Sequence, residues 1–86
     1  MALKVSSVQF QHRANDKEYN LGRIAAFTAQ AASEGSHLAA FPEMCIGGYW
    51  HVPKLDAAAL RALAEPLTGP SISYVSRLAR EHGIAI

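Results

Sequence analysis

The residue types that could carry out chemistry gather in one short stretch, residues 41–51. Glu43 follows an apolar segment and a proline, and a pair of glycines and three polar-tipped rings come soon after it. In an open parallel α/β sheet, ligands bind beyond the carboxyl ends of the strands. A partly desolvated carboxylate at that place could act as a general base. The alternative interpretation is a structural glutamate that caps the loop.

Cys45 is the only cysteine of the chain and lies two residues after Glu43. In an extended segment the two side chains would point the same way, roughly 6–7 Å apart, which is too far for a direct hydrogen bond. Met44 and Ile46 flank the thiol, and no cation or histidine is visibly placed beside it. We therefore interpret Cys45 as a small buried residue and not as a nucleophile.

The four histidines of the chain invite a metal-site interpretation, but their spacings match no zinc pattern. They are His12, His37, His51 and His82. We expect no metal site and no cofactor. His82 stands where a helix should end, and a cation there meets the negative pole of the helix dipole. His51, together with Trp50, either lines a substrate pocket or packs against the loop.

The scaffold that the hydrophobic pattern predicts is a βαβ unit, so the fold class is α/β. Residues 3–10 are apolar on both faces, as in a strand that is covered above and below. A helix follows over residues 15–35, with a capping box of Asn15 and Glu18 at its start and a left-handed glycine at its end. Residues 38–41 form the second strand, and the crossover makes the two strands parallel.

Two further helices are predicted after a long loop at residues 44–55. The capping and breaking residues place them at residues 56–66 and 69–83. The second of these helices has an apolar stripe of Ile72, Val75, Leu78 and Ala79. Residues 84–86 begin a third strand. Because an unfinished apolar strand is an aggregation hazard in an independent domain, we expect residues 1–86 to be a fragment of a longer domain.

Composition argues against several classes of function. Eight Lys and Arg residues stand against seven Asp and Glu, and no basic run exists, so nucleic acid is not an expected partner. No apolar run approaches the ~20 residues of a membrane span, and the N-terminus lacks the pattern of a signal peptide. A single cysteine without an intrachain partner fits a reducing compartment, so we expect a cytoplasmic protein.

The stretch at residues 41–49 resembles the segment around the catalytic glutamate of the nitrilase, or carbon-nitrogen hydrolase, superfamily. In that family an apolar strand ends in a Pro-Glu pair, and a Gly-Tyr pair follows a few residues later. Pro42 with Glu43 and Gly48 with Tyr49 match these pairs. The first strand, the first helix and the later Gly-Pro helix start are also similar, so the resemblance covers essentially the whole chain.

The resemblance implies a four-layer α-β-β-α sandwich, of which residues 1–86 would be the N-terminal fragment. It also implies a hydrolase that converts small amides, carbamoyl compounds or nitriles to acids with a Glu-Lys-Cys triad and a thioester-type acyl-enzyme. Glu43 matches the general base, and Tyr49 matches a position near the mouth of the substrate pocket. The family's lysine and nucleophilic cysteine segments are absent, so we expect this chain alone to be inactive and the complete protein to be a dimer.

Two hypotheses from other classes of function are open beside this one. A truncated or degenerate, non-catalytic chain could associate with another chain through its open sheet edge. A nucleotide-binding βαβ module ranks last, because the first strand-to-helix turn at residues 11–15 contains no glycine that would admit a phosphate.

Overall fold

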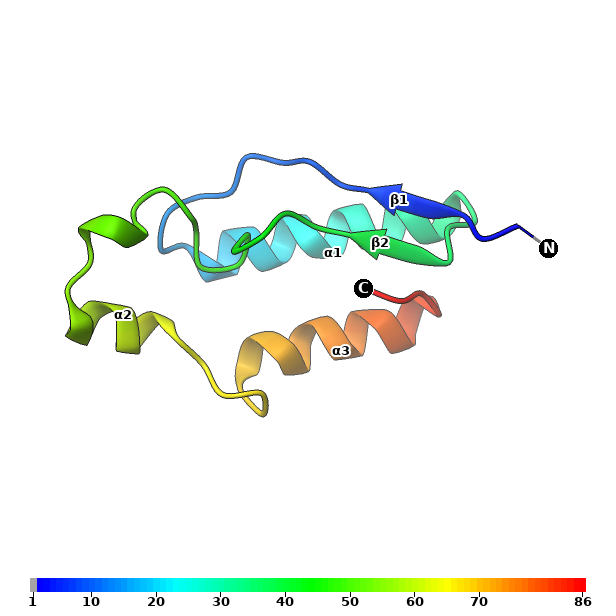
Figure 1. Cartoon of the computed structure of the whole chain (residues 1–86). Helices are drawn as coiled ribbons and strands as arrows, with labels where there is room; N and C mark the ends of the chain where they lie inside the picture. The colour runs from blue at the N-terminus through cyan, green and yellow to red at the C-terminus, as the bar shows by residue number, and fades with distance from the viewer. Residues whose placement is uncertain (1) are drawn as a thin grey trace.

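A two-stranded parallel sheet is the scaffold of the chain in the computed structural model, which describes residues 2–86. Strand β1 (Val5–Ser7) pairs with β2 (Leu38–Ala40), with Val5 opposite Leu38. Helix α1 (Lys17–Ser33) connects the two strands and lies along the sheet (Figure 1). The predicted parallel βαβ unit is therefore confirmed.

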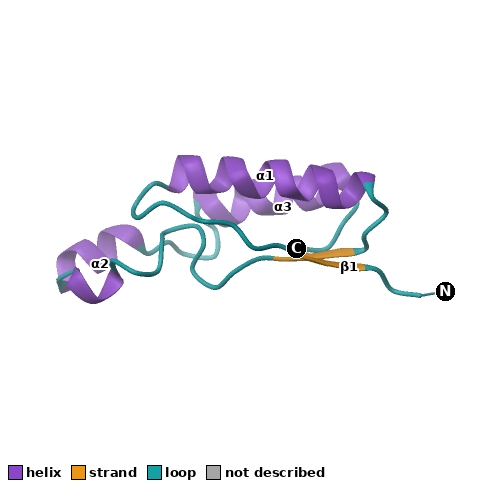
Figure 2. Ribbon diagram, turned by 90° about the horizontal axis from the view of Figure 1, so that it is seen from above, coloured by secondary structure: helices purple, strands orange, loops and turns teal. Residues whose placement is uncertain are grey.

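Strand β1 is shorter than the predicted strand over residues 3–10. Val8 adds one more ladder bond, from its N–H to the carbonyl of Ala40 at 2.8 Å, and the ladder ends there because Pro42 has no N–H to continue it. Figure 2 shows α1 and a later helix on one face of the sheet, with the other face open. Leu3, which precedes β1, is 73% exposed, and Val5, at the start of β1, is 49% exposed. Within residues 2–86 only one face of β1 is covered, so the expectation of a strand covered on both faces stays a prediction for the complete domain.

The N-cap of helix α1 lies one residue later than predicted. Asn15 has a left-handed backbone with φ 54°, which places it before the cap. The cap is Asp16, whose carboxylate accepts the N–H of Tyr19 at 3.0 Å. Asparagine tolerates the left-handed region, and aspartate caps a helix as well as asparagine does. The predicted capping box of Asn15 and Glu18 is wrong, whereas the left-handed glycine after the helix is confirmed at Gly35 (φ 83°).

Three helical segments follow β2. The loop predicted to be irregular contains a 3₁₀ turn, η1 (Val52–Lys54). Helix α2 (Ala57–Leu63) is capped by Asp56, as predicted. Helix α3 (Pro70–His82) also ends as predicted, at a left-handed Gly83 with φ 62°. None of the helices within residues 2–86 combines the length and the apolar character that a membrane crossing requires.

Helix α3 packs beside α1 on the same face of the sheet (Figures 1 and 2). Leu78 of α3 is buried against Ile24 of α1. At the start of α3 the predicted stripe is wrong, because Ile72 is 43% exposed and Ser71 is buried instead. Ser71 faces inward because Glu65 binds both its N–H and its hydroxyl group.

The third strand is present as a single parallel bridge between Ala85 and Leu38. The N–H of Ala39 donates to the carbonyl of Ala85 at 2.8 Å, and the N–H of Ala85 donates to the carbonyl of His37 at 3.0 Å. Ile84, next to the bridge, is buried in a second small core cluster with Ala31 of α1 and Ala39 of β2. The predicted start of a third strand at residues 84–86 is confirmed to this extent.

Candidate active site

Glu43 lies in the turn that follows β2, beyond the carboxyl end of the parallel sheet. Its side chain is exposed, so the partial desolvation expected from the sequence is not found in this chain. Within residues 2–86, no hydrogen bond or ion pair occupies the Glu43 carboxylate. A glutamate that capped the loop would bond to it, so the structural alternative is not supported.

The backbone turns sharply after Glu43 because Met44 adopts a left-handed conformation with φ 55°. Positive φ is uncommon outside glycine and tends to occur at functional sites. The turn leaves Glu43 in solvent and places Cys45 in the core, 6% exposed. Burial raises the pKa of the Cys45 thiol, which keeps it in its unreactive protonated form. The interpretation of Cys45 as a buried residue is confirmed, and the two side chains do not share a face.

The Gly-Tyr pair forms a second tight turn in the same loop. Gly48 has φ 99°, and its N–H donates to the carbonyl of Met44 at 2.9 Å. The Tyr49 ring meets the Trp50 ring edge-on, with centroids 5.1 Å apart, and the two residues are 40% and 82% exposed. Trp50 therefore does not pack into the protein interior. The two rings form an aromatic surface in the loop that carries Glu43.

Replacing Gly48 by alanine is expected to disrupt this turn. A Cβ at Gly48 would lie 2.8 Å from Cε1 of His51 and 3.0 Å from the backbone Cα of Ala14. We expect Gly48→Ala to lower the free energy of unfolding, measured in urea, by more than ~1 kcal/mol. Gly35→Ala is the matched control, because its φ is also positive but its Cβ would meet nothing within 4 Å. Equal losses of unfolding free energy in both variants would show that the close approach of Gly48 to Ala14 does not contribute to the effect.

Asn20, a buried residue that the sequence analysis did not identify, holds the loop that contains Glu43 and Tyr49 to α1. Asn20 is 0% exposed, and its Nδ2 donates to the carbonyls of Arg13 and Ile46, both at 2.8 Å. Its Oδ1 accepts the N–H of Arg13 at 2.8 Å. The available sequence signal is the four-residue spacing to Ile24 and Thr28, which places Asn20 on the buried face of the helix.

A second polar cluster, which the sequence also did not indicate, ties the start of α1 to the start of α3. Lys17 Nζ lies 2.6 Å from Oε2 of Glu65 and donates to the carbonyl of Leu63 at 2.5 Å. Glu65 also accepts the N–H and the hydroxyl of Ser71, at 2.8 and 2.5 Å. The hydrogen bonds from Lys17, and then from Ser71, lower the pKa of Glu65 to about 2.

Protonation of Glu65 at acidic pH is expected to lower the free energy of unfolding. Because its pKa in the folded chain is depressed, its stabilisation is complete above the unfolded value of about 4.3 and is lost as the pH falls toward about 2. Glu65→Gln should therefore flatten the pH dependence of the unfolding free energy in that window. Glu81→Gln should keep it, because Glu81 meets only Arg77, at 3.6 Å on an exposed helix face. An unchanged slope in Glu65→Gln would contradict the assignment.

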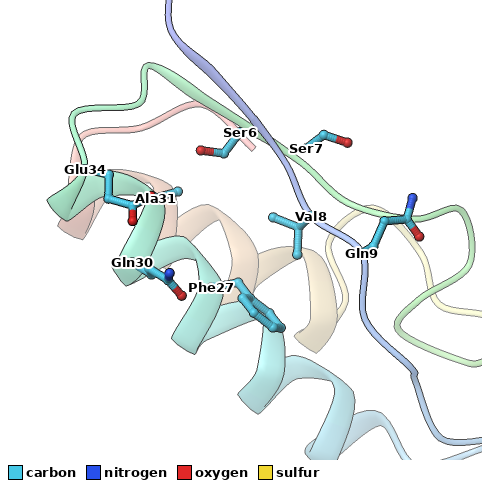
Figure 3. Close-up of a pocket in the computed structure, with 8 residues that line it drawn as sticks. All are labelled: Ser6, Ser7, Val8, Gln9, Phe27, Gln30, Ala31 and Glu34. Carbon is cyan, nitrogen blue, oxygen red and sulfur yellow. The ribbon is translucent and has the colours of Figure 1, made fainter.

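Two open cavities lie near the sheet, and neither collects the predicted site residues Glu43 and Tyr49. One of about 430 Å³ lies between the Glu43 turn, α2 and α3, and its lining includes Met44, Cys45, Leu60, Leu63 and Ile72. The other, of about 300 Å³, lies between β1 and α1 and is lined by Ser6, Val8, Phe27, Gln30 and Glu34 among others (Figure 3). Across residues 2–86, no three His, Cys, Asp or Glu side chains are placed to hold a metal ion.

Comparisons with known proteins extend this picture. A family model described as carbon-nitrogen hydrolase matches residues 4–86. Two curated proteins of Mycobacterium tuberculosis, Hydrolase MT0498 of strain CDC 1551 and Hydrolase Rv0480c of strain H37Rv, are each 38% identical to the chain over 73 residues. The match covers 83% of this chain, but the chain spans only 23% of the length of either relative. No solved structure gives a significant match.

Proposed function

The chain belongs to the carbon-nitrogen hydrolase family, and on that premise we propose that Glu43 is the general base of an enzyme that cleaves non-peptide carbon-nitrogen bonds. The substrates are small amides, carbamoyl compounds or nitriles. The observation that carries the proposal is the unpaired, exposed carboxylate in the first turn after β2, at the sheet edge where parallel α/β folds bind ligands. Tyr49, exposed in the same loop, would line the mouth of the pocket.

Residues 1–86 are, in this proposal, the N-terminal part of one hydrolase domain with an α-β-β-α sandwich fold. The open sheet face, together with the exposed Leu3 and Val5, supports a second sheet that covers it. The lysine and the nucleophilic cysteine would come from the rest of the domain, so this chain alone would be inactive. We further propose that the complete protein is a dimer, and that it is cytoplasmic because Cys45 is a free buried thiol.

Glu43 would move protons twice in the proposed reaction. Its carboxylate takes the thiol proton of the cysteine as the sulfur attacks the amide carbon, and the lysine stabilises the oxyanion. The proton then passes to the leaving nitrogen, the carbon-nitrogen bond breaks, and ammonia departs from a thioester. In the second step Glu43 takes a proton from water while the water oxygen attacks the thioester carbon. The carbon-sulfur bond breaks, which releases the carboxylic acid and restores the thiol with that proton.

The experiment that tests the proposal is an assay of the complete hydrolase that contains this chain. Ammonia release is measured with a panel of small amides, carbamoyl compounds and nitriles. Turnover that depends on Glu43 supports the proposal. Full turnover by the Glu43→Gln variant would overturn the assignment of the general base.

Association through the open sheet edge is a second candidate function. Among the described strands, β1 pairs only with β2, so its other edge has no partner strand. An unpaired edge beside the exposed Leu3 and Val5 can serve as a template for another chain. Light scattering distinguishes the candidates, because a clean monomer with a cooperative thermal transition would count against association.

A further inference from the structure

Three hydrogen bonds hold the loop that carries Glu43 and Tyr49, one to α1 and two to the segment before α1. The Asn20 amide donates to the carbonyl of Ile46, and the N–H of Asn15 donates to the carbonyl of Gly47 at 3.0 Å. The third bond runs from the backbone N–H of Tyr49 to Nε2 of His12, at 3.0 Å. Of the three, only this last bond depends on the charge state of a side chain, because an imidazole nitrogen accepts a hydrogen bond only when it carries no proton.

His12 must be neutral to make its contact with Tyr49. A ring nitrogen that accepts an N–H carries a free lone pair, so the proton of the neutral ring resides on Nδ1. Nδ1 of His12 is buried and has no partner among the described residues. The ring also lies edge-on to Phe10, with centroids 6.5 Å apart and an interplanar angle of 82°. The N–H at Nδ1 thus has no acceptor among the described residues, and the only hydrogen bond of the ring is the one that Nε2 accepts from Tyr49.

Protonation of His12 would turn its acceptor nitrogen into a donor, so that two N–H groups face each other at the Tyr49 contact. The charged ring would also gain no compensating bond at Nδ1, and burial of an unpaired charge is costly. Among the described residues no carboxylate forms an ion pair with His12, and the neighbouring Arg13 lies 3.9 Å from Asp16. His51, in the same turn, makes no hydrogen bond through either of its buried ring nitrogens among the described residues, so it does not bond to His12 in this structure.

We propose that His12 is a positioning residue for the Tyr49 turn, and that its protonation releases this turn. The site would then be ordered at neutral pH and loosened in mild acid. The effect of this pH-dependent release on catalysis rests on the proposed roles of Glu43 and Tyr49. The contact between His12 and Tyr49 is a property of the fold and can be tested without any catalytic assay.

Nuclear magnetic resonance of the ¹⁵N-labelled full chain tests the proposal directly. At neutral pH, the imidazole nitrogen shifts should show the tautomer of His12 that is protonated at Nδ1. As the pH is lowered, the amide resonance of Tyr49 should shift with the same midpoint as the His12 ring. A His12 ring protonated at Nε2, or a Tyr49 amide that stays in place while His12 titrates, would overturn the proposal, and neither result depends on a variant that must fold.

His12→Gln separates the hydrogen bond from the titration. A glutamine side chain offers an oxygen acceptor at similar reach but does not change charge, so the Tyr49 amide should keep its neutral-pH shift and lose its pH dependence. His37→Gln is the matched control, because Nδ1 of His37 accepts the N–H of Lys4 at 2.9 Å, before the start of β1. A pH response of Tyr49 that survives in His12→Gln would assign the effect to another group, with His51 the first to examine.

The experiments on Glu43 and on His12 test the two proposals independently, so that either proposal can be wrong while the other holds. If the Glu43→Gln enzyme keeps full turnover, Glu43 is not the general base. The Tyr49 resonance and its pH midpoint should then be unchanged, and the proposal for His12 would still hold. If the Tyr49 amide resonance does not follow the protonation of His12, the proposed pH-dependent release of the Tyr49 turn is wrong. The loss of turnover in Glu43→Gln would still support the catalytic role of Glu43. In the complete enzyme, His12→Gln should also abolish the acid-side loss of activity that follows the Tyr49 midpoint.

Discussion

A complete hydrolase that carries Glu43→Gln is expected to turn over its substrate about 10²- to 10⁴-fold more slowly than the wild-type enzyme, the usual contribution of a positioned general base. The physical reason is that glutamine has nearly the shape of glutamate but cannot accept a proton. Both proposed steps need that proton transfer, first from the thiol and then from water. The loss corresponds to about 3–5 kcal/mol of transition-state stabilisation.

The kinetic pattern of this variant distinguishes a catalytic role from a structural one. Glu43 is exposed and makes no hydrogen bond within residues 2–86, so its replacement should leave the unfolding free energy unchanged within about 0.5 kcal/mol. The loss should appear in kcat more than in KM, because the base acts in the transition state. Glu34→Gln, an exposed carboxyl at the other end of α1, should retain full kcat. A comparable loss in both variants would point to a general electrostatic effect.

The parallel βαβ unit could be predicted from the sequence because it depends on local signals that act within a few residues. Gly35 and Gly83 adopt the left-handed conformation at helix ends that glycine alone reaches without a steric penalty. Pro42 ends the strand ladder because it lacks an N–H group. The predicted start of α1 was wrong because two neighbouring residues of similar chemistry compete for the cap position. Asn15 and Asp16 both cap helices well, and only the left-handed φ of Asn15 decides between them.

The candidate site could be predicted only in part. Position and residue type were sufficient to predict that Glu43 lies beyond the carboxyl end of β2 and that Cys45 is buried, whereas the catalytic role of Glu43 stays a prediction. The hydrogen bonds that shape the loop join residues far apart in the chain, such as Asn20 with Ile46 and Lys17 with Glu65. No local pattern encodes such pairs, because their partners are backbone carbonyls or single charges brought close by the tertiary fold.

Replacing Asn20 by leucine is expected to be the most destabilising single change in the described part of the chain. The amide makes three hydrogen bonds, to the N–H and carbonyl of Arg13 and to the carbonyl of Ile46, and it is fully buried. Leucine has a similar size but would leave these three backbone groups without a partner. Because a buried group that loses its partner costs about 1–3 kcal/mol, we expect a loss of at least ~3 kcal/mol. Circular dichroism should record a fall in Tm of roughly 12–24 °C.

Thr28→Val is the matched control for Asn20→Leu, because Thr28 is also 0% exposed and lies two turns further along the same face of α1. Its hydroxyl oxygen is buried and has no hydrogen-bond partner among residues 2–86. Valine keeps the branched shape and removes the unpaired group, so this change should be neutral or slightly stabilising. Asn20 and Thr28 are both fully buried on the same face of α1. They differ because, in the described part of the chain, the Asn20 amide is hydrogen-bonded and the Thr28 hydroxyl is not. Similar losses at both would mean that packing, and not the hydrogen bonds of Asn20, holds the Glu43 loop against α1.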